Sequence, residues 1–243
     1  MRIFNAIVLV SFVLLCGACK VMYLPTMQNV PMFREKGEFQ ASIAAQNLQV
    51  AYSATEQVGV IINGYKRKNK VPTLDDEENY NYMADSYGID FGIGYLKNGD
   101  EGNEMEVYGG YGFGRASLSY ENDAPISSGG GPRGGSSHYN KFFFQPVFIN
   151  RNDDLDFGFS VRVSMLDFYD FQDELDEPLE VDKPIFLEPA LTLSKHLSAI
   201  SLRAQFQYSF ASGSAGNNFG TYNPYKNKTL LNFGVTINME KLN

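Results

Sequence analysis

The strict alternation of apolar with small or polar residues in LDFGFSVRVSM, residues 155–165, constrains the fold of this chain more than any other feature. A period of two gives a β-strand one apolar and one polar face, and this run is longer than most strands of globular proteins. Similar runs recur at 39–45, 48–52, 58–65, 87–95, 104–120, 138–150, 185–194, 200–210 and 231–239. The sequence therefore predicts an all-β protein of about ten strands, one for each run.

The connections between these runs alternate in length. Long polar connections are expected at 66–81, 121–137, 168–182 and 211–228, and short ones at 53–57, 97–103, 151–154 and 195–198. An even number of antiparallel strands with this alternation puts the long connections at one end and both termini at the other. We therefore predict a single up-and-down antiparallel β-barrel over residues 37–243. A bulge or kink is expected at Gly109-Gly110, where the alternation changes phase.

The composition of the polar face of the predicted strands indicates which face points outward. A water-facing sheet would carry many Lys, Glu and Thr, whereas this face is mostly Gly, Ser, Ala, Asn and Gln, which suits a narrow lumen. The apolar face would then meet lipid, as in a transmembrane barrel. Aromatic residues near strand ends would form its girdles, namely Tyr52, Tyr65, Tyr82, Tyr95, Tyr120, Tyr208 and Phe210. The alternative is a soluble barrel with its apolar residues inside.

The N-terminal residues have the features of a secretory signal peptide, with Arg2 ahead of an apolar run that is too short to span a membrane. Small residues precede Cys19, and this ending resembles the lipobox of bacterial lipoproteins, whose cysteine is acylated, for example with palmitate. The resemblance implies a signal peptide at 1–18 and an acylated N-terminus and linker at 19–36, with Cys16 as the alternative acylation site. The following residues lack the acidic tract of surface-exported lipoproteins, so the resemblance implies a periplasmic anchor.

A second resemblance follows the lipobox. The stretch YLPTMQNVPMFREKGEF is similar to the start of outer-membrane β-barrel proteins of unassigned role from Bacteroidota, through Tyr23, Pro25, Pro31, Lys36, Gly37 and Glu38. It implies a bacterial outer-membrane location, with short turns and both termini periplasmic and long connections extracellular. Membrane lipid and other outer-membrane proteins are the expected partners. The formal net charge of −8 argues against nucleic acid as a partner.

The strand phase points charged side chains into the predicted lumen, namely Glu38, Asp90, Glu106, Arg162, Glu188 and Arg203. These groups could line a path for ions or solutes. They could also form buried salt bridges that fill a small barrel. We prefer the salt bridges, because barrels of this width are mostly filled by side chains.

No motif in the sequence indicates catalysis, a cofactor or a metal site. Only His138 and His196 could act as a base for a hydroxyl nucleophile, and His138 lies beside two serines in an expected loop that offers no rigid orienting shell. The glycine-rich stretch SSGGGPRGGSS lacks the Lys-Ser/Thr ending of a phosphate-binding loop. The acidic residues at 75–78 and 170–182 could bind calcium, but they lack EF-hand spacing, so we interpret them as solvated charge.

The sequence thus predicts a non-enzymatic outer-membrane barrel lipoprotein without a cofactor, acting as a structural or accessory subunit of an outer-membrane complex. One alternative is a narrow channel, in which lumenal Arg162 or Arg203 would control conductance. The other is a soluble, lipid-anchored barrel that binds an apolar ligand inside.

Overall fold

The computed structural model describes residues 24–72, 81–99, 102–120, 135–152, 154–173, 183–197, 199–212 and 228–238. Within these residues the regular structure is all β-strand. None of the residues described forms a helix that is long and apolar enough to cross a membrane. The predicted signal peptide and Cys19 lie outside the described residues.

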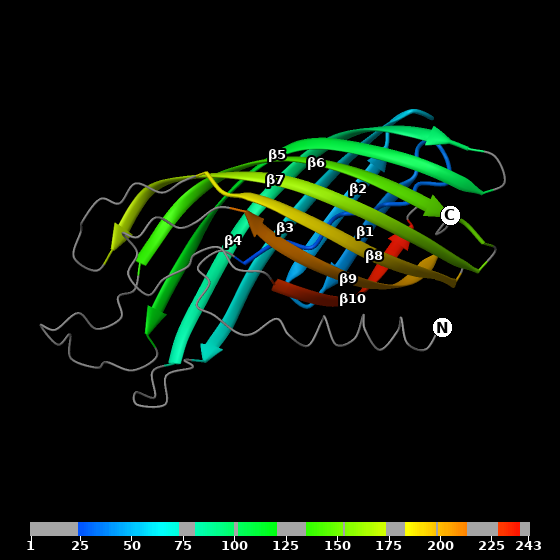
Figure 1. Ribbon diagram of the computed structural model, residues 1–243. Coiled ribbons are helices and arrows are strands. Elements are labelled where there is room, and N and C mark those ends of the chain that lie inside the picture. Colours follow the sequence, from blue (N-terminus) through cyan, green and yellow to red (C-terminus); the bar gives the residue numbers. More distant parts are fainter. Residues whose placement is uncertain are drawn as a thin grey trace, which may run out of the picture.

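Ten antiparallel strands form one closed barrel, in which each strand pairs with its neighbours in the sequence and β10 pairs with β1 (Figure 1). The strands are β1 (Phe39–Ala44), β2 (Asn47–Ser53), β3 (Val58–Pro72), β4 (Asn81–Asn98), β5 (Asn103–Tyr120), β6 (Gly135–Asn150), β7 (Leu155–Asp173), β8 (Ile185–Leu197), β9 (Ile200–Ser212) and β10 (Lys228–Asn238). The predicted all-β fold, an up-and-down antiparallel barrel of about ten strands, is confirmed.

The connections at the two ends of the barrel differ in length. The strand ends that flank the connections 73–80, 121–134, 174–184 and 213–227 lie at one end, here called the long-connection end. The connections 54–57, 99–102, 151–154 and 198–199 lie at the other, the short-connection end. The last described strand, β10, ends beside the start of β1, at the short-connection end.

The alternation in β7 separates an inner from an outer face. Phe157 and Val163 are each 41% exposed, whereas Ser160 and Arg162 are 1% and 2% exposed. Each of the other strands also exposes large apolar side chains, including Ile43, Leu48, Ile62, Phe91, Phe113, Phe142, Leu187, Leu202 and Phe233. We call this outer surface, to which all ten strands contribute, the apolar belt.

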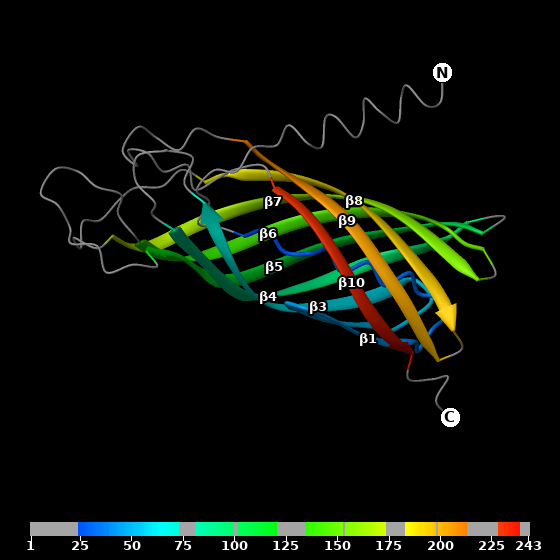
Figure 2. The ribbon, with the colours of Figure 1, turned by 90° about the horizontal axis from the view of Figure 1, so that it is seen from below.

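The lumen is occupied by the protein's own N-terminal chain. Residues 24–34, here called the lumen segment, form neither helix nor strand, and the side chains from Leu24 to Phe33 are all buried. Figure 2 shows this segment in blue within the barrel. The segment forms no regular structure, as its prolines predict, and it leads to the first strand from inside the barrel. The linker was predicted at residues 19–36, of which 19–23 lie outside the described residues.

The barrel wall has an uneven height. β1 and β2 contain 6 and 7 residues, whereas β7 contains 19. The ladder of β3 with β2 ends at Tyr65, but β3 continues along β4 to Pro72, so the loop expected from residue 66 begins later. The β1–β2 turn at Ala45-Gln46 is therefore the lowest part of the rim at the long-connection end.

The bulge predicted at Gly109-Gly110 is wrong, because β5 keeps a continuous register with both of its neighbours. The irregularity lies instead between Ser136 and His138, where the pairing of β6 with β7 shifts. The apparent change of phase in β5 arises because aromatic residues lie on both faces of the strand. Tyr108 is an aromatic residue on the inner face, fully buried, whereas the next two aromatic residues of the strand point outward.

Glycines on the inner face make room for large inward side chains. A Cβ atom at Gly92 would lie 2.8 Å from Cγ1 of Ile61 and 3.1 Å from Cζ of Phe143. A Cβ atom at Gly88 would lie 2.6 Å from the hydroxyl of Tyr65. Tyr65 is buried and points into the barrel, so its predicted place in an outer aromatic girdle is wrong. Its strand was expected to end at Tyr65, but β3 continues to Pro72.

Adjacent glycines in β5 provide a test of this packing. A Cβ atom at Gly110 would clash with the carbonyl oxygen of Phe91 and the ring of Phe143, whereas the nearest atom to a Cβ at Gly109 lies 4.0 Å away. We expect Gly110→Ala to lower the free energy of unfolding by about 1–3 kcal/mol through overpacking. The matched control, Gly109→Ala, is expected to be neutral or slightly stabilising. Urea unfolding of the refolded barrel, followed by circular dichroism, measures both; equal effects would contradict the packing described.

Candidate functional site

Two buried ion pairs lie on the inner face of the wall, one between β4 and β6 and one between the neighbouring strands β7 and β8. Lys141 Nζ lies 2.5 Å from Asp90 Oδ2, and Arg162 Nε lies 2.7 Å from Glu188 Oε2. All four residues are at most 3% exposed. Because the charges cancel in pairs, the lumen contains no excess of either sign at this level.

Thr26 of the lumen segment connects the two ion pairs. Its hydroxyl accepts a hydrogen bond from Lys141 Nζ at 3.0 Å and donates to Asp90 Oδ2 at 3.3 Å. Its carbonyl oxygen accepts from Arg162 Nη2 at 2.5 Å and from Gln207 Nε2 at 3.0 Å. A buried backbone carbonyl in an apolar environment needs such donors. The ion pairs therefore bind the lumen segment and also fill the barrel.

Amide side chains bind the middle of the lumen segment. Gln49 donates to the carbonyl of Gln28 at 3.0 Å, and Gln145 donates to the carbonyl of Asn29 at 2.8 Å. The backbone amide of Gln28 donates in turn to Gln207 Oε1 at 3.1 Å. These strand residues come from widely separated parts of the wall, so the segment holds opposite sides of the barrel together. The small and amide residues that indicated a narrow lumen serve here as partners for an extended chain.

An apolar layer follows toward the short-connection end. Val30, Met32 and Phe33 of the lumen segment belong to one buried cluster with inward side chains of the wall, among them Ala51, Ile61, Leu96, Tyr108, Phe143, Val147 and Ile149. Two wall glycines allow close approach of this segment. A Cβ atom at Gly59 would lie 2.8 Å from Phe33 Cε2, and one at Gly158 would lie 2.5 Å from Met32 Cε. This layer fills the side of the lumen that β2 to β6 enclose.

Arg151 holds the lumen segment at the short-connection end. Its guanidinium donates to the carbonyl oxygens of Met32, at 3.1 Å, and Phe33. It also forms ion pairs with Glu104 and, at 3.2 Å, with Asp156. Burial alone would lower the pKa of Arg151, but the hydrogen bond and charge of Glu104 and the charge of Asp156 outweigh it and raise the pKa. Arg151 is therefore a permanent cation that satisfies two buried carbonyls.

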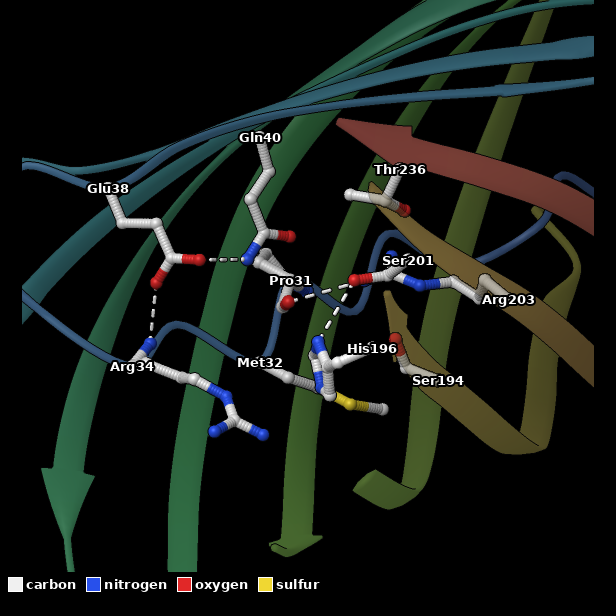
Figure 3. A pocket seen from close by; sticks show the side chains of 10 residues that line it. All are labelled: Pro31, Met32, Arg34, Glu38, Gln40, Ser194, His196, Ser201, Arg203 and Thr236. Carbon is white, nitrogen blue, oxygen red and sulfur yellow. Dashed lines mark hydrogen bonds between the residues drawn. The ribbon is translucent and has the colours of Figure 1, made fainter. Parts of the chain in front are cut away.

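A pocket opens beside this end of the segment (Figure 3). It is lined by Pro31, Met32, Arg34, Glu38, Gln40, Ser194, His196, Ser201, Arg203 and Thr236. Within it, the Ser201 hydroxyl lies 2.9 Å from His196 Nδ1, and His196 Nε2 lies 2.8 Å from Asp156 Oδ2. A hydroxyl, an imidazole and a carboxylate in a chain of this kind can activate a nucleophile. The Asp156 carboxylate also binds Arg34 at 2.8 Å and Arg151, so much of its charge is already neutralised.

The structure places the six predicted lumen charges around the lumen segment. Three of them lie at the level of Thr26: Asp90, which accepts from its hydroxyl, and the ion pair of Arg162 with Glu188. The remaining three contact its other end: Glu106 accepts from the amide of Phe33 at 3.0 Å, Arg203 donates to the carbonyl of Pro31 at 3.3 Å, and Glu38 accepts from the amide of Arg34 at 2.6 Å.

Lys141 was not predicted as a site residue, and His196 was named only as a possible base. In β6, aromatic residues occur on both faces of the strand, so the pattern did not show that Lys141 points inward. His196 was assigned to a short turn, whereas it belongs to β8 and faces the pocket. The pairing of Asp156 in β7 with residues at the end of β8 is the signal that could have found it, once the hairpin register was known.

The other histidine candidate is not assembled into a site. His138 is on the outer face of β6, where its ring stacks on Tyr169 at 5.8 Å. Ser137 points inward and donates to the carbonyl of Tyr169 at 2.8 Å, whereas Ser136 accepts from Arg115 at 3.0 Å. Among the described ranges, no group of three or more His, Cys, Asp or Glu residues could hold a metal ion. The acidic stretches at 75–78 and 174–182 lie outside those ranges.

Replacement of Arg151 tests its role in holding the lumen segment. Arg151→Gln leaves the carbonyls of Met32 and Phe33 short of a donor and removes two ion pairs. We expect the free energy of unfolding to fall by about 2–4 kcal/mol. Lys195→Gln is the matched control, because its partner Asp154 is exposed and such pairs contribute less than about 1 kcal/mol. Urea unfolding compares the two, and equal losses would contradict the role of Arg151.

No protein-family model matches the chain, and no curated protein matches it. Among solved structures, CarO of Acinetobacter baumannii is similar with a TM-score of 0.32 and 10% identity, over 84% of this chain and 97% of that chain. CarO2 of Acinetobacter baumannii is similar with a TM-score of 0.30 and 8% identity, over 83% of this chain and 97% of that chain. Likenesses this distant carry no argument about function.

Proposed function

We propose that the protein is an outer-membrane β-barrel lipoprotein whose lumen is closed by its own N-terminal segment. It acts without conducting solutes and without catalysis, as a structural or accessory subunit of an outer-membrane complex. The observation that carries this proposal is the lumen segment, because buried residues from Leu24 to Phe33 occupy the space that a channel would need.

The apolar belt supports the membrane location. Soluble monomers rarely expose apolar patches larger than a few hundred Å², whereas here each of the ten strands exposes large apolar side chains. A closed ladder also leaves no strand edge in the lipid, where an unpaired backbone group costs several kcal/mol. The polar inner face argues against the soluble alternative, because an apolar ligand inside would meet ion pairs and amides rather than an apolar cavity.

Conductance of the purified protein in planar lipid bilayers tests the closed lumen. We expect no stepwise current, because ion flow would require the lumen segment to leave two ion pairs and an apolar layer at once. Steady single-channel currents from the wild-type chain would sink the proposal and favour the narrow channel. In that case, neutral substitution of Arg162 or Arg203, which lie beside the segment, should change the currents.

A filled lumen leaves the outer wall and the connections as the surfaces available for function. The wall formed by the longest strands rises above the β1–β2 turn at the long-connection end, which provides a surface for a neighbouring protein. Pull-down of the tagged chain from native membranes in mild detergent tests the subunit role. Outer-membrane partners in stoichiometric amounts are expected, and isolation as a lone barrel would argue against it.

A second function, hydrolysis of an ester or amide, is favoured by the Ser201–His196–Asp156 chain of hydrogen bonds. We rank it lower because Asp156 also binds Arg34 and Arg151, and because Arg203, the cation that lines the same pocket, already donates to a carbonyl of the lumen segment. A fluorophosphonate probe tests it, with Ser201→Ala as the control. Our proposal expects no labelling at Ser201, and labelling that the substitution abolishes would favour a hydrolase.

A further inference from the structure

The hydrogen bonds of the lumen segment give its direction through the barrel. Near its start, the carbonyl of Pro25 accepts from Arg67 Nη1 at 2.6 Å, in the part of β3 that continues beyond β2. At its other end, Arg34 lies 2.8 Å from Asp156, next to the short connection 151–154. Figure 1 shows the blue segment starting in the left half of the barrel and running toward the short connections on the right. The described chain therefore begins at the long-connection end.

The start of the segment lies at one edge of the apolar belt. On the outer face of β3, Ile62 is apolar and exposed, whereas Lys66 and Lys68 beyond it are exposed cations. Arg67 lies between these lysines, so its bond to the segment marks the height at which the belt ends. The β1–β2 turn closes at the same height, because the amide of Lys66 donates to the carbonyl of Gln46 at 3.2 Å.

The length of the preceding chain limits where Cys19 can lie. Fully extended, the residues from Cys19 to Leu24 span at most about 18 Å. The apolar band of an outer-membrane barrel is about 25 Å tall. The way back through the lumen is filled by the segment itself, whose residues from Leu24 to Phe33 are buried. A chain of this length is long enough to bring Cys19 to the edge of the belt at the long-connection end and too short to bring it to the opposite edge.

We infer that the chain before the lumen segment leaves the barrel at the long-connection end, over the β1–β2 turn, and that an acyl chain on Cys19 inserts into the leaflet on that side. The inference rests on the proposed outer-membrane location and acyl anchor. The hydrophobic layer of the outer leaflet is then the partner of the anchor. This side is opposite to the periplasmic anchor expected from the residues that follow Cys19.

Thiol labelling of the full-length chain in its native membrane tests the side of exit. Single variants Met22→Cys, Ser128→Cys and Asn152→Cys place a thiol before the lumen segment, in a long connection and in a short connection. A membrane-impermeant maleimide is applied to intact cells and, separately, to permeabilised cells. We expect the thiols at positions 22 and 128 to react on intact cells at similar levels, and the thiol at 152 to react only after permeabilisation.

The two control positions separate failure of this inference from failure of the proposed location. If the thiols at 128 and 152 behave as expected but the thiol at 22 reacts only after permeabilisation, the inference is overturned. An epitope inserted between Lys20 and Val21 provides a second readout that projects beyond the lipid headgroups, and its inaccessibility to antibody on intact cells would overturn the inference as well. If the thiols at 128 and 152 react alike on intact cells, the orientation expected from the sequence, with the long connections outside the cell, is wrong, and the inference falls with it.

Discussion

Replacing residues 24–33 with a Gly/Ser linker of equal length is expected to convert a silent barrel into a conducting one. The linker keeps the chain tethered but removes the side chains of Val30, Met32 and Phe33, whose burial contributes about 1.5–3 kcal/mol each. It also removes Thr26, which joins the two ion pairs. Single-channel currents in planar bilayers should appear in the variant and be absent from the wild-type chain. The variant should also unfold at a lower urea concentration.

The same experiment has a control within the chain. A Gly/Ser replacement of residues 121–134, of equal length, changes a connection outside the barrel wall and should leave the bilayer silent. A synthetic peptide with the sequence of residues 24–34 should block the currents of the first variant, and it should also assist refolding if the linker variant folds poorly alone. Currents that do not respond to the peptide, or a silent folded variant, would show that the segment is not what closes the lumen.

The barrel itself could be predicted from the sequence because its signal is local. Side chains in a strand alternate between faces, so the sequence of residues 155–165 predicts both the strand and which residues lie on each of its faces. The number of strands and the alternation of connection lengths then followed from repeating the same reading along the chain. The errors at Gly109-Gly110 and Tyr65 arose where large rings point inward, because an aromatic residue alone does not tell a lipid-facing position from a lumen position.

The filled lumen could not be predicted in the same way, because it depends on contacts between residues distant in sequence. Nothing local distinguishes an extended chain inside a barrel from an extended linker outside it. Thr26 and Lys141, for example, meet across 115 positions. The predicted set of inward charges contained part of this network, since Glu188 and Arg162 belong to the set and form an ion pair. What the pattern lacked was the recipient of their remaining hydrogen bonds, which is the backbone of the lumen segment.

The ion pair between Arg162 and Glu188 is expected to show the strongest coupling in the lumen. Glu188 is fully buried and accepts from Arg162 at 2.7 Å and from Ser164 at 3.0 Å. Glu188→Leu leaves the guanidinium buried without a counter-charge, which should lower the free energy of unfolding by about 3–5 kcal/mol. Arg162→Met should cost a similar amount, since it leaves the carboxylate unpaired.

The double variant Arg162→Met/Glu188→Leu shows whether the two charges are coupled, that is, whether each is needed mainly to neutralise the other. With both groups replaced by apolar residues, no buried charge is left unpaired, and Gln207 still donates to the carbonyl of Thr26. We expect a loss well below the sum of the single variants. Asp167→Asn, which breaks the exposed pair with Lys183, should change the free energy by less than about 1 kcal/mol. Because the chain contains no Trp, urea unfolding is followed by circular dichroism. Additive losses would show that the two charges act independently, and the lumen would then be held together by its amides and apolar layer rather than by paired charge.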